Sequence, residues 1–128
     1  MSKEKLYIFD TTLRDGAQTQ GVDFSIDDKE KISIVLDTLG VDYIEGGWPG
    51  ANPTDTEFFN KDHGFKNAKL TAFGMTKKSE HSAENDPMLA SLINSKSSSV
   101  CLFGKSWDFH VDVALGITNE ENLENISE

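Results

Sequence analysis

An arginine and an aspartate stand side by side near the start of the chain, in the run Asp10-Thr-Thr-Leu-Arg14-Asp15-Gly-Ala-Gln18. The run follows a short apolar stretch, so we expect it to form a loop at the carboxyl end of a strand. A carboxylate such as Asp15 can bind a hard divalent cation, and a guanidinium such as Arg14 can stabilise an oxyanion on a substrate. The alternative for the same two residues is an ion pair that only fixes the loop.

Alternating strand and helix patterns surround this loop and must position it. Apolar or β-rich runs predict strands at residues 6–9, 41–45, 69–73 and 98–103. Helical spacing predicts helices at residues 25–40, 54–60, 86–93 and 119–128. About four strand-helix units indicate an α/β fold with a parallel sheet, and both a doubly wound sheet and a barrel satisfy the pattern.

The helix expected over residues 25–40 has a marked start and end. Ser25 suits an N-cap, and Asp27 and Asp28 complement the helix dipole in the first turn, so we assign these two carboxylates to the helix and not to catalysis. Gly40 suits the C-terminal end. The predicted buried face carries apolar residues at spacings of three and four: Ile32, Val35, Leu36 and Leu39.

Loops at the carboxyl ends of parallel strands form the site in both architectures. We therefore expect residues 10–20, 45–52, 74–78 and 104–110 to share one face. The last segment leads into Asp108-Phe-His110-Val-Asp112. On a strand, alternation would place these polar side chains together as metal ligands, but ligation also needs converging geometry. We expect His110 to contact a substrate instead, and a surface histidine is the alternative.

The run FDTTLRDGAQTQG, followed after the first helix by VDYIEGGWPGANPTD, resembles the DRE-TIM metallolyases. This family includes the 2-isopropylmalate, homocitrate and citramalate synthases and the hydroxymethylglutaryl-CoA lyases. The resemblance implies a metal-binding TIM barrel with Asp15 as a ligand of a divalent ion, either Mn, Mg or Zn. It further implies that Arg14 and Glu45 are catalytic, and that Gln18 lies near the substrate.

Two later segments, TAFGMTKK and LFGKSWDFHVDVALGITNEENLENI, look most like the citramalate synthases within that family. This similarity implies a condensation of acetyl-CoA with pyruvate in isoleucine biosynthesis, with 2-isopropylmalate or homocitrate synthase as the alternative. In the implied reaction the metal binds the 2-oxo acid, a base deprotonates the acetyl methyl, and Arg14 stabilises the oxyanion. Glu45 would orient or hydrogen-bond this assembly.

The family also places a His-x-His metal-binding pair on a late strand, and this chain has none: its histidines are His63, His81 and His110. A complete barrel takes about 250 residues. We therefore expect residues 1–128 to be the N-terminal half of a TIM (β/α)8 barrel, a partial pyruvate carboxyltransferase-type domain truncated at its C-terminus, with little or no turnover alone. An alternative of another class is a noncatalytic half-barrel interaction module that pairs through its open sheet edges.

The composition of the chain excludes some classes of binding partner. A formal net charge of -10 opposes binding to nucleic acid or anionic membranes. The absence of a long apolar run and of a signal-peptide pattern predicts a cytoplasmic protein. We expect the full-length enzyme to be a homo-oligomer. The single cysteine, Cys101, lies between Val100 and Leu102 and is predicted to be a buried strand thiol.

Overall fold

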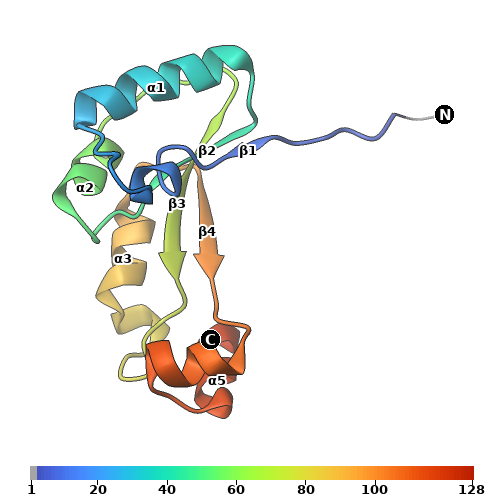
Figure 1. Ribbon diagram of the computed structural model, residues 1–128, viewed down its shortest axis with the longest axis vertical. Helices are drawn as coiled ribbons and strands as arrows, with labels where there is room; N and C mark the ends of the chain where they lie inside the picture. The colour runs from blue at the N-terminus through green and yellow to red at the C-terminus, as the bar shows by residue number, and fades with distance from the viewer. Residues whose placement is uncertain (1–2) are drawn as a thin grey trace.

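The computed structural model describes residues 3–128 and shows four parallel strands alternating with helices (Figure 1). The strands are β1 (Phe9–Asp10), β2 (Tyr43–Gly47), β3 (Lys69–Met75) and β4 (Ser99–Phe103), and they lie in the order β1-β2-β3-β4. A doubly wound sheet reverses its strand order at a switch point, whereas a barrel adds its strands in sequence. This sheet therefore has the arrangement of half a TIM barrel, as predicted.

Helices follow the strands in alternation. They are α1 (Ile26–Leu39), α2 (Pro53–Phe59), α3 (Pro87–Asn94), α4 (Asp108–His110) and α5 (Asn119–Ser127). Short 3-10 turns lie at Gly16–Gln18 and Ala83–Asn85, and a π-helical turn at Val111–Leu115 follows α4. In Figure 1, α5 lies beyond the carboxyl ends of β3 and β4. Within residues 3–128, no helix has the length and apolar character that a membrane crossing requires.

The hydrophobic core lies between the sheet and its covering helices. Ile44, Leu70 and Ala72 from the strands pack with Phe58 and Phe59 of α2, Leu92 of α3 and Leu13 from the loop after β1. Gly46 allows this close approach, because a Cβ atom there would lie 2.7 Å from Cε1 of Phe58. The packing fixes the helix-facing side of β2 and β3, so alternate residues must point to the opposite side.

The opposite side of the sheet carries polar residues. Glu45 pairs in register with Thr71, and Thr71 pairs with Ser99. The hydroxyls of Thr71 and Ser99 lie 2.6 Å apart. In a closed barrel this side faces the interior, and a barrel enzyme binds its substrate at the carboxyl ends of the strands, where Glu45 lies near the end of β2.

The ends of α1 agree with the sequence prediction, but its buried face does not. Ser25 and Asp28 form a reciprocal capping box, and Gly40 ends the helix with a left-handed backbone. The buried residues of α1 are polar, Lys29, Ser33 and Asp37, while Ile32 and Leu36 are partly buried. The prediction that Val35 and Leu39 belong to the buried face was wrong, since both are exposed. Burial of the polar stripe is possible because each member has a hydrogen-bond partner.

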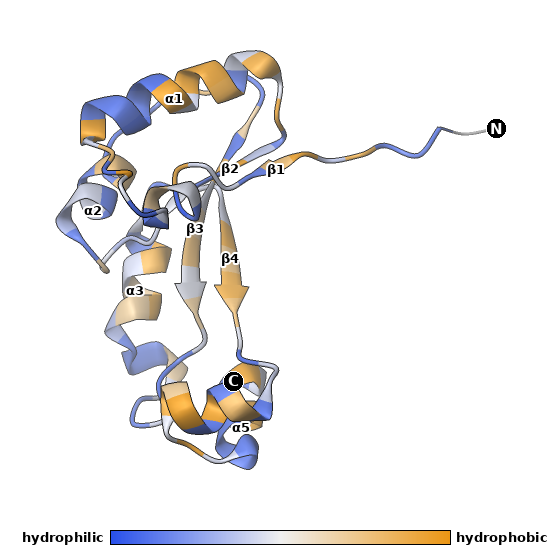
Figure 2. Cartoon of the chain, in the orientation of Figure 1, coloured by the Kyte–Doolittle hydropathy of each residue, from blue (hydrophilic) through white to orange (hydrophobic). Residues whose placement is uncertain are grey.

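The two outer strands also differ from the predictions. β1 covers Phe9–Asp10 and not residues 6–9, and Leu6, Tyr7 and Ile8 lie exposed in an extended arm. Cys101 is in β4 as predicted, but it is only half-buried. Figure 2 shows the apolar character of β4, where Val100 and Leu102 are about half-exposed. Within the described chain β1 pairs only with β2 and β4 only with β3, so neither outer strand is covered as a central strand would be.

Candidate active site

The loop after β1 brings Arg14 to the carboxyl end of β2. Three successive amides, those of Arg14, Asp15 and Gly16, donate to the carbonyl of Thr11 at 3.2, 2.8 and 3.1 Å, which folds the loop into a tight turn. From this turn Nε of Arg14 donates to Oε2 of Glu45 at 2.7 Å. Residues 31 positions apart in sequence thus meet at adjacent strand ends, which is where parallel sheets place their sites.

Glu45 is buried, and its partner Arg14 is also held by an aromatic ring. Glu45 is 1% exposed, on the side of β2 that faces away from the helices. The guanidinium carbon of Arg14 lies 4.3 Å from the centre of the Phe73 ring, a cation–π contact that fixes the plane of the guanidinium. Glu45 and Phe73 therefore fix the Arg14 guanidinium in place. The guanidinium can stabilise negative charge on a substrate only through the N–H donors that Glu45 does not occupy.

Cys101 belongs to the same group of side chains. Burial raises the pKa of its thiol, the carboxylate of Glu45 raises it further, and Arg14 partly offsets this effect. The pKa of the thiol therefore depends on where the Glu45 carboxylate lies. Because only the thiolate is an effective nucleophile, the rate at which Cys101 is alkylated should change if that carboxylate moves.

Asp15 lies at the open edge of this group. Its side chain is 67% exposed, and its Oδ1 lies 3.3 Å from a terminal nitrogen of Arg14. A carboxylate oxygen at an accessible strand end fits the donor type that a hard divalent cation prefers, so Asp15 fits as one ligand. Residues 3–128 contain no group of three or more His, Cys, Asp or Glu side chains placed to hold a metal ion. Asp15 therefore offers a carboxylate of the right donor type, and no complete metal site lies within residues 3–128.

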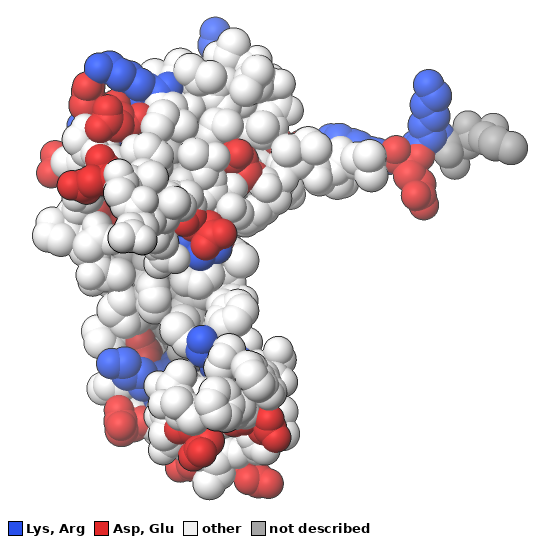
Figure 3. Space-filling model, viewed as in Figure 1, with Lys and Arg blue, Asp and Glu red and all other residues white. Residues whose placement is uncertain are grey.

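Gln18 lies beside Arg14 at a hollow of ≈ 360 Å³. Trp48 and Asn52, from the loop after β2, also line the hollow. The hollow therefore brings the loops after β1 and β2 together, as expected for the carboxyl ends of parallel strands. Acidic groups lie at both ends of the face shown in Figure 3, and a red and blue cluster marks its middle.

His110 does not join this group in the part of the chain that the structure describes. It is exposed, and its nearest aromatic neighbours are Trp107 and Phe109, with ring centres 4.5 and 6.2 Å away. Residues 108–112 do not form the strand that the metal-ligand alternative required, since α4 and the following π-helical turn occupy them. Strand alternation therefore does not bring Asp108, His110 and Asp112 to one face.

The polar residues that support the loop after β2 were not predicted from the sequence. Lys29 of α1 is 2% exposed, and its Nζ donates to the carbonyl of Gly46 at 2.9 Å and to the carboxylate of Asp55. Asp55 also accepts from the backbone amide of Trp48 and from the side chain of Asn52, both at 2.9 Å. A signal was present, because Lys29 lies three residues before Ile32 and seven before Leu36, on the packed face of α1, where a lysine needs a partner.

Comparison with known proteins agrees with this architecture. Residues 5–128 match the HMGL-like family. The (R)-citramalate synthase of Aquifex aeolicus (strain VF5) is 55% identical over 127 residues, which cover 98% of this chain and 24% of that protein. The (R)-citramalate synthase of Sulfolobus acidocaldarius is 48% identical over 98% of this chain and 24% of its own length. The 2-isopropylmalate synthase 1 of Caldanaerobacter subterraneus subsp. tengcongensis is 35% identical, over 100% of this chain and 32% of that protein.

The chain spans about a quarter of the length of the citramalate synthases that it matches. The match nevertheless includes the loop that carries Arg14 and Asp15 and the strand β2 that carries Glu45. The sequential parallel sheet, the polar row on its uncovered side and the match over residues 5–128 lead to one conclusion, that the chain belongs to the HMGL-like family.

Proposed function

We propose that this chain supplies the Arg14–Asp15–Glu45 part of the active site of a citramalate synthase, which condenses acetyl-CoA with pyruvate. The observation that carries the proposal is the 2.7 Å contact between Arg14 and Glu45, with Asp15 beside it at an open strand end. The greater similarity to (R)-citramalate synthases, at 55% and 48% identity against 35% for a 2-isopropylmalate synthase, supports the choice of pyruvate. We assign the reaction to isoleucine biosynthesis in the cytoplasm, and residues 1–128 to part of a pyruvate carboxyltransferase-type barrel.

Each residue has a role that its environment supports. Glu45 is buried and accepts from Nε of Arg14, so it holds the guanidinium in place. Arg14 then presents the terminal N–H groups that Asp15 does not occupy to the oxygen that becomes negative when the carbonyl of pyruvate is attacked. Gln18 lines the adjoining hollow and can hydrogen-bond the substrate carboxylate. We keep His110 as a proposed substrate contact that would require α4 to approach the site.

Asp15 is the residue that would hold the metal. A bound divalent ion would polarise the carbonyl of the 2-oxo acid and orient its carboxylate. The described residues contain no group of three or more His, Cys, Asp or Glu side chains placed to hold an ion, so we expect further ligands from other parts of the full-length enzyme. Asp15 therefore provides one anchoring oxygen, and the chain alone is expected to turn over little or no substrate.

A chimera tests the proposal directly. Residues 1–128 would replace the matching 127-residue segment of the Aquifex aeolicus (R)-citramalate synthase, to which they are 55% identical. CoA release would be measured with acetyl-CoA and pyruvate in the presence of Mn²⁺ or Mg²⁺. We expect turnover that Asp15→Ala abolishes and that the exposed-site control Lys31→Met retains. A folded chimera without turnover would overturn the proposal, and turnover by the isolated chain would refute the need for further residues.

The same chimera separates the alternatives within the family. A higher kcat/KM with pyruvate than with 2-oxoisovalerate supports the citramalate synthase assignment. The reverse preference would assign these residues to a 2-isopropylmalate synthase background, and a preference for 2-oxoglutarate would favour homocitrate synthase.

A second candidate is a noncatalytic half-barrel that binds a partner through its open edge. The observation that favours it is the apolar surface of β4, where Val100, Leu102 and Phe103 are each about half-exposed. An edge strand with apolar side chains can pair with another chain. Size-exclusion chromatography of the chain between low and high micromolar concentration tests this candidate, because a monomer throughout would count against it.

A further inference from the structure

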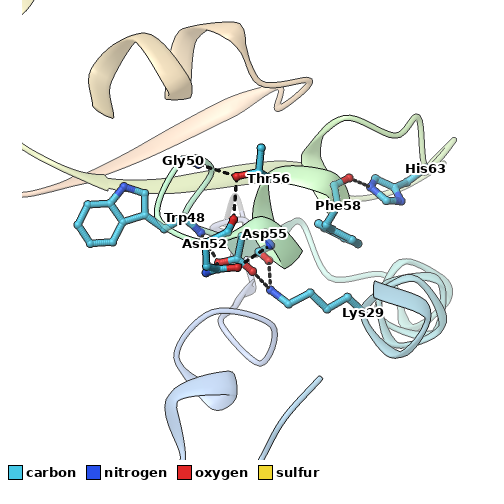
Figure 4. Close-up of polar contacts among 9 residues, drawn as sticks. Lys29, Trp48, Gly50, Asn52, Asp55, Thr56, Phe58 and His63 are labelled. Carbon is cyan, nitrogen blue, oxygen red and sulfur yellow. Dashed lines mark hydrogen bonds and ion pairs between the residues drawn. The ribbon is translucent and has the colours of Figure 1, made fainter. Parts of the chain in front are cut away.

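A buried network joins α1, β2 and α2 behind the Arg14–Glu45 pair. Figure 4 shows Lys29 extending from α1 to Asp55, while Asn52 and the amide of Trp48 approach the same carboxylate. The side chains of Lys29 and Asp55 are 3% and 12% exposed. A buried ion pair is weak support for overall stability, because desolvation of two charges offsets most of their attraction. Its position therefore suggests a role other than stability.

The network holds an irregular backbone segment next to Glu45. The pairing of β2 with β3 shifts its register between Glu45 and Gly47, as a bulge does. Lys29 binds the carbonyl of Gly46 inside that shift at 2.9 Å. Gly47 has φ +141°, and a Cβ atom there would lie 2.5 Å from Cγ of Asp55. The carboxylate thus packs directly against the bulge, and only glycine leaves room for it.

The bulge is connected to both members of the Arg14–Glu45 pair. Glu45 immediately precedes Gly46, so the orientation of the Gly46 peptide sets the direction of the Glu45 side chain. On the other side of the bulge the Trp48 ring packs edge-on against Phe73, with ring centres 5.4 Å apart. The Phe73 ring in turn lies against the Arg14 guanidinium at 4.3 Å. The network therefore reaches Glu45 through the backbone and Arg14 through two aromatic rings.

We infer that Lys29 and Asp55 are positioning residues, whose ion pair fixes the β2 bulge so that Glu45 points at Arg14. The inference deepens the proposed function, on which it rests for the importance of the Arg14–Glu45 pair. It concerns geometry alone and needs no substrate to test. The competing explanation is that the pair only joins α1 to α2, in which case its loss would leave Glu45 where it is.

Cys101 provides a readout of the position of Glu45. It is the single cysteine of the chain, and the carboxylate of Glu45 helps to raise the pKa of its thiol. Movement of that carboxylate away from Cys101 would lower the pKa and speed alkylation. The rate of reaction with iodoacetamide between pH 7 and pH 10 therefore measures the thiol pKa, and Glu45→Gln defines the value without the charge.

The main variant is the double substitution Lys29→Met/Asp55→Asn, which removes both buried charges together and leaves neither unpaired. The matched control is Lys31→Met/Asp27→Asn, the same substitutions at an exposed ion pair on the same helix. We expect the main variant to be alkylated about threefold faster than wild type at pH 8, in the direction of Glu45→Gln, since reactivity follows the thiolate fraction. The control should match wild type. Far-UV circular dichroism checks that each variant is folded.

A double-mutant cycle with Glu45→Gln distinguishes an effect on the position of Glu45 from a general increase in the accessibility of Cys101. If the network acts through Glu45, Lys29→Met/Asp55→Asn should change the rate no further in the Glu45→Gln background. The inference is overturned if the folded main variant is alkylated at the wild-type rate. It is also overturned if the double substitution increases the alkylation rate by the same factor in the Glu45→Gln background. If the main variant does not fold, Asn52→Ala replaces it, because it removes the hydrogen bond that Asn52 donates to the Asp55 carboxylate, together with the N-cap bond that Asn52 accepts from the Asp55 amide, and keeps both charges. A smaller increase is then expected, and none would overturn the inference. Chimera activity is a separate measurement, so failure of the proposed function would not be mistaken for failure of this inference.

Discussion

The Arg14–Glu45 pair should respond unequally to loss of either partner, because the two side chains differ in burial. Glu45 is 1% exposed, whereas the Arg14 side chain is 21% exposed and also contacts Asp15. Arg14→Ala leaves a buried, unpaired carboxylate and should lower the free energy of unfolding by about 3–5 kcal/mol. Glu45→Gln leaves an amide oxygen that can still accept from Nε, so its cost should be about 0.5–1.5 kcal/mol.

Urea unfolding followed by far-UV circular dichroism at pH 7 measures both losses. Lys31→Met serves as the control, because its ion pair with Asp27 is exposed and screened by solvent, so its loss should leave the free energy of unfolding nearly unchanged. Equal losses in the two variants would refute this reasoning.

Three further predictions concern acid stability, packing and catalysis. Burial raises the pKa of Asp37 and of Asp86, but backbone N–H donors outweigh this effect and hold both pKa values below the usual range. The free energy of unfolding should therefore fall as the pH drops from about 5 to about 2. Urea unfolding at a series of pH values would show this fall, which should be less steep in Asp37→Asn. Gly46→Ala should lower the free energy of unfolding in urea by about 1–3 kcal/mol, because its Cβ would lie 2.7 Å from Phe58. The control Gly16→Ala, whose Cβ would lie 3.7 Å from its nearest neighbour, should lower it by less than about 0.5 kcal/mol. Equal losses would contradict the close packing described for Gly46. In the chimera, Arg14→Lys should lower kcat about 100- to 1000-fold in the CoA-release assay with little change in KM, as loss of an oxyanion donor does, and wild-type kcat would contradict the assigned role.

Local rules account for the parts of the fold that the sequence predicted well. The capping box at Ser25 and the left-handed turn at Gly40 depend on a few neighbouring residues, so both can be read directly from the sequence. The strand-end argument likewise anticipated that Arg14 and Glu45 lie on one face, since parallel strands direct their carboxyl ends to the same edge. Their roles in catalysis, with those of Gln18 and His110 and the metal-binding role of Asp15, stay predictions.

Nonlocal contacts account for the errors. Periodicity assigned α1 an apolar face, but Lys29 and Asp37 are buried there because their partners lie 26 to 31 residues away in sequence. Residues 108–110 form a short helix that the π-helical turn continues. A segment as short as residues 108–112 fits either period, so its pattern alone does not decide between helix and strand.

The sequence by itself determined the order of strands and helices, the caps of α1, and the acidic and basic residues available at each strand end. These features follow from backbone preferences and hydrophobic spacing, which act over a few residues. Only the tertiary structure decided that the sheet is sequential, that Glu45 is buried against Arg14, and that Lys29 and Asp55 lie behind the bulge next to it. The physical reason is that a buried charge is tolerated only where a partner meets it, and distant segments become partners only when the packed core brings them together.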